Sequence, residues 1–201
     1  MWAMAKVRCD WATRNELEQI YHDNEWGIPE HDDQKLFEML LLESMQAGLS
    51  WLTILKKITT LAAAYSQFNY EKIATYSDEK IDSLMADPGI IRNKLKIKAA
   101  INNAQAFMQI QQEFGSFDSY IWSYVAGIPQ KNHREALTDV PASTELSDQI
   151  SKDLKKRGFK FLGTTTVYAF LQAIGIVEDH LVYCYKANDK SDDFRSVEAH
   201  K

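Results

Sequence analysis

The sequence predicts an all-α fold. Apolar residues recur at helical spacing in several segments of the 201-residue chain. Strict alternation of apolar and polar residues over a strand length is nearly absent, and Tyr70–Ala74 comes closest to it. The eight glycines and four prolines separate the helical segments, as at 27–29, 88–89 and 127–129. Together these three observations favour helices joined by short turns.

The elements follow in order from this spacing. The segment 32–47 carries Leu36, Met39 and Leu40 on one face, and Asp32 or Asp33 is suited to cap its first turn. The segment 50–66 continues the pattern with Trp51 at its start. Further helices are expected in the segments 78–86, 94–114, 116–125, 145–157 and 164–175.

Composition indicates an ordinary globular protein, with 45% hydrophobic and 25% charged residues. The length suits one large domain or two small lobes, and we assign a single domain to 9–185. Residues 1–8 are expected to be a flexible terminus, and the polar residues 186–201 a disordered tail. No apolar run reaches the ~18 residues of a membrane span, and no signal peptide is evident. We expect a cytoplasmic monomer that makes no membrane contact.

The two cysteines of the chain each have a histidine nearby. Cys9 precedes His22, and His180 precedes Cys184 at a spacing that shares one face of a helix. Two thiolates and two imidazoles would complete a tetrahedral zinc site, which would be closed and structural. Free buried thiols are the ordinary alternative. A disulfide between the cysteines is disfavoured because nothing indicates secretion.

The net charge is −5, yet two segments are basic. Residues 92–98 hold four cations and no acid, and residues 152–160 hold five cations and one acid. Such patches suit a short footprint on a phosphate backbone, although solvated helix faces look the same. The connection D-P-G-I-I-R-N-K, with Gly89, Arg92 and Lys94, has the character of a helix–hairpin–helix whose amides could face a phosphate. Short glycine turns between helices are, however, common.

Several ordered motifs carry a family resemblance. They are Y-H-D-N-E-W-G (21–27), L-E-S-M-Q-A-G-L-S-W (42–51), P-G-I-I-R (88–92), K-K-R-G-F-K-F-L-G-T-T (155–165) and H-L-V-Y-C (180–184). From about residue 8 to residue 185 the chain resembles the constitutive bacterial 3-methyladenine DNA glycosylase I family. The resemblance implies the fold of the helix–hairpin–helix glycosylase superfamily. It also implies one structural zinc, with ligands on Cys9, His22, His180 and Cys184.

The reaction that the resemblance implies is hydrolysis of the N-glycosidic bond of 3-methyladenine in alkylated double-stranded DNA, without lyase activity. The products are the free base and an abasic site. An enzyme of this kind must extrude the base from the duplex, at a cost of about a few kcal/mol. N3-methylation makes the purine cationic, so the base departs as a neutral group. Residues 95–107 contain no acid, which fits a reaction that needs little activation of water.

Three residues are assigned to the base pocket. Glu43 interrupts an apolar run, where a carboxylate must meet solvent or find a partner. The resemblance makes Glu43 the catalytic, base-reading residue and Trp51 the stacking residue, and Tyr21 is matched to a pocket tyrosine. The alternatives are a solvent-facing glutamate and a core tryptophan. Because Tyr21 adjoins His22, zinc would position a pocket wall.

Some assignments stay open. Glu18 occupies a position where the family carries a second tyrosine, and its carboxylate could favour a cationic base or point outward. Lys156, Arg157 and Lys160 could hold DNA phosphates or simply stabilise a helix end. Asp23 and Asp179 adjoin metal-ligand candidates and are expected to support or cap them. The alternative function is a non-catalytic, zinc-stapled helical module that binds DNA or modified bases. A third is a purely structural helical protein.

Overall fold

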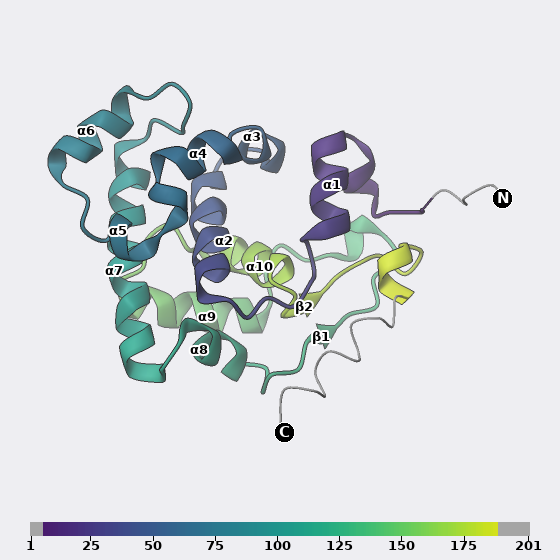
Figure 1. Ribbon diagram of the computed structural model, residues 1–201. Coiled ribbons are helices and arrows are strands. Elements are labelled where there is room, and N and C mark those ends of the chain that lie inside the picture. Colours follow the sequence, from purple (N-terminus) through teal and green to yellow (C-terminus); the bar gives the residue numbers. More distant parts are fainter. Residues whose placement is uncertain (1–5, 189–201) are drawn as a thin grey trace.

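In the computed structural model, which describes residues 6–188, the long helix α7 (Lys94–Phe114) contacts several other helices (Figure 1). These are α2 (Asp33–Gln46), α5 (Tyr70–Ile73), α6 (Asp78–Ala86) and α8 (Phe117–Ser123). The α7 residue Phe107 is fully buried, and its ring stacks on that of Phe117 with centroids 4.3 Å apart. The mostly helical fold that the sequence predicts is confirmed.

The remaining helices surround this group. They are α1 (Glu16–Asn24), α3 (Trp51–Leu55), α4 (Ile58–Ala64), α9 (Glu145–Lys156) and α10 (Thr164–Ala173). Short 3-10 turns occur at Asp10–Thr13, Ser66–Phe68, Leu137–Asp139 and Tyr185–Asn188. The helix α10 packs against both α9 and α2. In Figure 1, α2 and α10 therefore lie between α6–α7 on one side and α1 on the other.

Helix boundaries follow side-chain caps that can be read from the sequence. The segments 78–86 and 94–114 begin and end as predicted. Asp32 caps α2 by accepting a hydrogen bond from the Lys35 amide. The predicted helix 50–66 is divided, because the backbone of Lys57 leaves helical geometry between α3 and α4.

The described structure differs from the sequence pattern in three other places. Tyr70–Ala74 does not form a strand: the Asn69 side chain caps a turn of helix over Tyr70–Ile73. The segment from His180 to Cys184 is irregular, so these two residues do not share a helix face. The strands β1 (Gln130–Lys131) and β2 (Val177–Glu178) pair in parallel, with Gln130 opposite Val177, and were not expected. Two residues per strand are too few to show alternation.

The two ends of the described chain lie side by side. The Tyr185 amide donates to the Val7 carbonyl at 2.9 Å, and the Tyr183 hydroxyl donates to Asp10 at 2.8 Å. Arg8 forms an ion pair with Asp23 on α1. The other parts of the predicted termini, 1–5 and 189–201, lie outside the described residues. Within the described part, no helix combines the length and the apolar character needed to cross a membrane.

Candidate functional site

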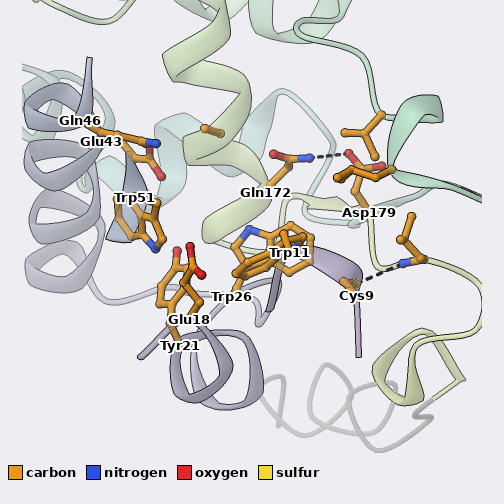
Figure 2. Close-up of a pocket in the computed structure, with 14 residues that line it drawn as sticks. Cys9, Trp11, Glu18, Tyr21, Trp26, Glu43, Gln46, Trp51, Gln172 and Asp179 are labelled. Carbon is orange, nitrogen blue, oxygen red and sulfur yellow. Dashed lines mark hydrogen bonds between the residues drawn. The ribbon is translucent and has the colours of Figure 1, made fainter. Parts of the chain in front are cut away.

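A pocket of about 280 Å³ lies between α1, α2, α3 and α10. It brings together the three residues assigned to base binding, Tyr21, Glu43 and Trp51. Figure 2 shows these residues at one end, Cys9 and Asp179 at the other, and two further tryptophans between them. The pocket therefore extends from the candidate base-binding residues to the candidate metal ligands.

Glu43 is a buried carboxylate whose lost contacts with water are only partly replaced by contacts with the protein. The residue is 4% exposed, and its Oε2 atom has no hydrogen-bond partner among the described residues. Burial raises the pKa of Glu43 to about 8. An unsatisfied buried carboxylate is costly unless a donor or a positive charge meets it. The site is thus suited to a ligand that supplies one or both.

Aromatic rings form the wall beside Glu43. The Tyr21 and Trp51 rings lie 5.1 Å apart between centroids, and the buried Trp51 Nε1 atom has no hydrogen-bond partner within residues 6–188. The rings of Trp11 and Trp26 continue the wall at 5.1 Å from each other. Burial raises the pKa of Tyr21 well above its usual value, and the charge of nearby Glu43 adds a smaller effect in the same direction. The Tyr21 hydroxyl therefore stays neutral. Such rings favour planar and cationic ligands.

Glu18 lines the same pocket from α1, three residues before Tyr21 (Figure 2). It is half-buried. Its side chain belongs to the pocket wall, which excludes the outward-facing alternative. The pocket therefore contains two carboxylates, one deeply buried and one nearer to solvent.

Three of the four predicted metal ligands form a buried cluster. The ligand atoms of Cys9, His22 and Cys184 all lie within 4.8 Å of one another. His22 Nε2 is 3.4 Å from Cys184 Sγ. Both cysteines are free thiols, so no disulfide joins them. Hydrogen bonding from Cys9, with a smaller contribution from His22, lowers the pKa of the Cys184 thiol and favours its thiolate.

His180 lies beside this cluster, but neither nitrogen of its ring is within 4.8 Å of all three ligand atoms. Its ring centroid is 5.1 Å from that of His22. Its buried Nε2 atom has no hydrogen-bond partner in the described part of the chain, whereas its Nδ1 atom is hydrogen-bonded to Glu178. Figure 1 shows the two ends of the described chain, in purple and yellow, on the same side of the molecule.

Carboxylates orient both histidines. His22 Nδ1 lies 3.0 Å from Asp23 Oδ1, so Nε2 is the nitrogen that faces the thiols. The Arg8 guanidinium holds the pKa of Asp23 well below its usual range. A carboxylate on the outer nitrogen is the usual support of a metal-binding histidine. Asp23 therefore has the supporting position expected from the sequence.

Asp179 supports the pocket in a different way. It is buried and accepts hydrogen bonds from Asn132 at 2.8 Å, Arg134 at 3.0 Å and Gln172 at 2.8 Å, and from Tyr168. Burial alone would raise its pKa, but these donors lower it. The carboxylate fixes the segment before His180 to α10 and the 132–134 loop.

The cluster and the pocket share a wall. The Trp26 ring stacks on His22 with centroids 6.1 Å apart and meets His180 edge-on at 4.6 Å. Gly27 follows with a φ of +78°, and a Cβ atom there would lie 2.6 Å from His180 Cε1. Only glycine fits both this conformation and this close approach. Any ligand of the cluster would thus act on the pocket geometry through Trp26 and Tyr21.

The predicted hairpin lies between α6 and α7. The Gly89 amide donates to Asp87 at 2.7 Å, and its carbonyl accepts from Thr60 at 2.7 Å and from Lys57 at 3.2 Å. A Cβ atom at Gly89 would approach Thr60 to 3.2 Å, which explains the glycine. Arg92 and Lys94 are exposed.

The second basic patch divides into free and paired cations. Lys156 and Lys160 are exposed. Arg157 instead pairs with Glu113 at 2.6 Å and Asp153 at 2.8 Å, so its guanidinium is engaged within the protein. The Asn103 side chain bonds both backbone groups of Lys160, which brings the patch next to α7. Lys98 and Lys160 line one hollow of about 340 Å³.

Sequence reasoning missed several pocket residues: Trp11, Trp26, Gln46 and Gln172. Gln46 could have been found, because it lies three residues after Glu43 and shares its helix face. Trp11 and Trp26 lie two residues after Cys9 and four after His22, which is a further usable signal. No signal in the sequence indicates Gln172.

A helical domain whose pocket joins an unpaired buried carboxylate to aromatic rings defines a class of protein that binds planar, electron-poor ligands. Residues 11–187 match the model of the methyladenine glycosylase family. The chain is 49% identical over 177 residues to DNA-3-methyladenine glycosylase 1 of Escherichia coli (strain K12), covering 88% of this chain and 95% of that one. The chain therefore belongs to the methyladenine glycosylase family.

Solved structures agree with this assignment. A crystal structure of 3-methyladenine DNA glycosylase I superposes with a TM-score of 0.86 at 48% identity, covering 89% of this chain and 98% of that one. A Staphylococcus aureus 3-methyladenine DNA glycosylase I, solved to explain 3-methyladenine recognition, gives 0.87 at 42% identity, covering 90% and 97%. The fold of this chain is that of 3-methyladenine DNA glycosylase I.

Proposed function

We propose that this protein is a monofunctional DNA glycosylase that releases 3-methyladenine from alkylated double-stranded DNA and leaves an abasic site. The observation that carries the proposal is the unpaired Glu43 carboxylate, buried beside the Tyr21 and Trp51 rings. The similarity to 3-methyladenine DNA glycosylases from E. coli and S. aureus supports the choice of base.

The pocket residues would act on a base that is already activated. The rings of Trp51 and Tyr21 would contact the extruded purine. The positive charge of the base would favour ionisation of Glu43, whose carboxylate would accept a hydrogen bond from the exocyclic amino group. The bond between C1′ and the base nitrogen breaks, and its electron pair neutralises the base. A water oxygen bonds to C1′ and releases one proton. Remote contacts to DNA hold the nucleotide in this position.

Hydrolysis without strand cleavage suits the pocket lining. A lyase step needs an amine that forms a Schiff base with the sugar. Among the described residues that line the pocket there is no lysine. The proposal therefore assigns attack on C1′ to water.

DNA contact is proposed for the hairpin and the neighbouring cations. The Gly89 amide donates to Asp87 within the turn, so the turn would contact the backbone through the exposed Arg92 and Lys94, and Lys156 and Lys160 would extend the contact. Arg157 is left out because it is paired with Glu113 and Asp153. Action as a monomer in the cytoplasm stays a prediction.

A structural zinc is proposed for the cluster. Bonds of ~2.3 Å to sulfur and ~2.0 Å to nitrogen place tetrahedral ligand atoms ~3.6 Å apart, which fits atoms within 4.8 Å of one another. Cys9, His22 and Cys184 would supply three ligands, and the partnerless Nε2 of His180 would supply the fourth. Zinc there would join the two ends of the domain and hold the wall formed by Trp26 and Tyr21.

The function is tested by base release from methylated duplex DNA, with the product identified by mass. The wild-type protein should release 3-methyladenine, and Glu43→Gln and Trp51→Ala should lose most of this activity while they stay folded. Glu38→Gln is the matched control, since it removes a carboxylate of α2 that pairs with Lys35 outside the pocket. Full activity in both pocket variants would overturn the assignment. Binding of the free base without release would select the non-catalytic module.

Metal analysis tests the zinc site separately. We expect about one zinc per chain, and Cys9→Ser should lower both the zinc content and the melting temperature, because site formation contributes to folding. Purified protein that contains no metal and gains no stability from added zinc would exclude the site.

A further inference from the structure

Lys96 differs from the other cations of the basic segment 92–98. Arg92, Lys94 and Lys98 are exposed, whereas Lys96 is only 6% exposed in the first turn of α7. The pattern of the basic segment predicts the same role for Lys96 as for its neighbours, a contact with phosphate. Its burial excludes that role and leaves its purpose to be explained from its contacts.

The Lys96 ammonium is bound to the end of α2. Its Nζ atom donates to the Met45 carbonyl at 2.7 Å and to the Ala47 carbonyl at 2.6 Å. The last carbonyls of a helix lack partners within the helix, and a cation there is favourable. The intervening Gln46 carbonyl accepts from the Leu49 amide at 2.6 Å. Lys96 therefore supplies two of the contacts that fix this end of α2.

The segment that Lys96 binds lies between the two pocket residues with unpartnered buried atoms. Glu43 is in the last turn of α2, and Trp51 begins α3 after the turn 47–50. Glu43 Oε2 and Trp51 Nε1 have no hydrogen-bond partners among the described residues to orient them. Their relative placement consequently depends on the backbone between them, which Lys96 holds at two carbonyls.

The same residue also belongs to the end of the hairpin turn. The Asn93 side chain caps α7 by accepting from the Lys96 amide at 3.1 Å. Lys96 thus joins the turn that carries Arg92 to the side of the pocket that carries Glu43. Burial lowers the pKa of Lys96, so an ammonium is retained there at a cost. An apolar side chain of similar length would fill the space without that cost, but it would donate no hydrogen bond.

We propose that Lys96 is a positioning residue that holds Glu43 and Trp51 in their base-binding arrangement from the helix that follows the DNA-contacting turn. The inference rests on the proposed function. It predicts that loss of the two carbonyl contacts impairs base binding and the chemical step, while duplex binding through the exposed cations persists.

The test compares Lys96→Met with Lys98→Met. Both variants remove one positive charge from the same helix, but Lys98 is exposed and no described hydrogen bond of its side chain is lost. For Lys96→Met we expect the rate constant of base release in a single-turnover assay to fall about tenfold. This corresponds to ~1.4 kcal/mol of activation free energy. The Kd for free 3-methyladenine, measured by calorimetry, should rise by a similar factor. Lys98→Met should leave both values near those of the wild type. Lys96→Met should bind undamaged duplex as the wild type does, whereas Lys98→Met, which removes an exposed cation, should bind it slightly more weakly.

Each outcome bears on the inference. A kcat and a Kd for the free base that match the wild type in folded Lys96→Met would overturn it, as would equal losses in Lys98→Met. A role in stability alone would lower the melting temperature without changing the Kd of the folded protein. If Lys96→Met does not fold, Lys96→Gln takes its place, since its side-chain amide still donates hydrogen bonds but carries no charge. It is then compared with Lys98→Gln in the same two assays. Failure of the wild type to release the base would instead overturn the proposed function, and the free-base Kd would still test Lys96.

Discussion

Replacing Glu43 by glutamine should make the protein more stable at neutral pH even though it removes the residue assigned to base recognition. Burial raises the pKa of Glu43 from 4.5 to about 8. The unfolded chain therefore releases this proton at lower pH than the folded protein does. As the pH rises from about 4.5 towards 8, the unfolded state gains stability relative to the folded state. Glutamine does not titrate and escapes this loss.

The magnitude follows from the pKa difference. Each pH unit between the two pKa values costs the wild type ~1.36 kcal/mol of unfolding free energy. Between about pH 5 and about pH 7.5 the wild type should lose about 3 kcal/mol relative to Glu43→Gln. The difference in unfolding free energy between the two proteins is compared at the two pH values, and this comparison cancels the constant cost of burying an amide. It also cancels the contribution of the cysteine and histidine cluster, which both proteins share.

The assay is urea unfolding of both proteins, followed by circular dichroism at the two pH values, with the free energies extrapolated to water. Glu38→Gln is the control, because that carboxylate pairs with Lys35 outside the pocket and its loss should give no gain. An advantage of Glu43→Gln that is equal at both pH values would refute the reasoning. It would mean that the Glu43 carboxylate has a partner, or water, that satisfies it in the folded protein.

Three further predictions concern the pocket, the cluster beside it and the basic patches. Trp51→Ala should weaken binding of free 3-methyladenine by about 1–3 kcal/mol in calorimetry, since one stacking face is lost; unchanged affinity would place Trp51 outside the binding surface. Gly27→Ala should destabilise the protein by at least ~1 kcal/mol and lower its zinc content. The reason is that the new Cβ atom would lie 2.6 Å from His180 Cε1, at a backbone φ of +78°. An unchanged melting temperature would contradict this. Arg157→Met should cost about 1 kcal/mol of stability with little change in duplex affinity. Lys94→Met should instead weaken duplex binding and reduce its salt dependence. The opposite pattern would show that Arg157 gives up its ion pairs with Glu113 and Asp153 to bind DNA.

The helical fold was predictable where the signals were local. The cap Asp32 and the apolar periodicity of 94–114 predict helices at the positions that the structure shows. The helix Glu16–Asn24 was missed because few of its residues are apolar, although the Asn15 side chain caps it. Its place in the fold comes from long-range contacts, such as the ion pair between Asp23 and Arg8.

The pocket was partly predictable. Glu43 could be recognised because a carboxylate within an apolar run is anomalous in any fold. Lys96 could not, because its run of cations has the pattern of an exposed surface, and only the end of α2, about fifty residues earlier, explains its burial. The proximity of Cys9 to Cys184 was expected on ligand chemistry, but the helix invoked for His180 and Cys184 was wrong. An irregular segment brings Cys184 to the cluster instead.

The position of the cysteine and histidine cluster has a consequence for synthesis of the protein. Cys9 and His22 leave the ribosome early, but their partner Cys184 follows only after more than 160 further residues. The wall that includes Trp26 and Tyr21 therefore lacks its C-terminal support until translation of the domain is nearly finished. A chain that ends before Cys184 lacks one of the three residues of this cluster, and with it the C-terminal support of the pocket wall.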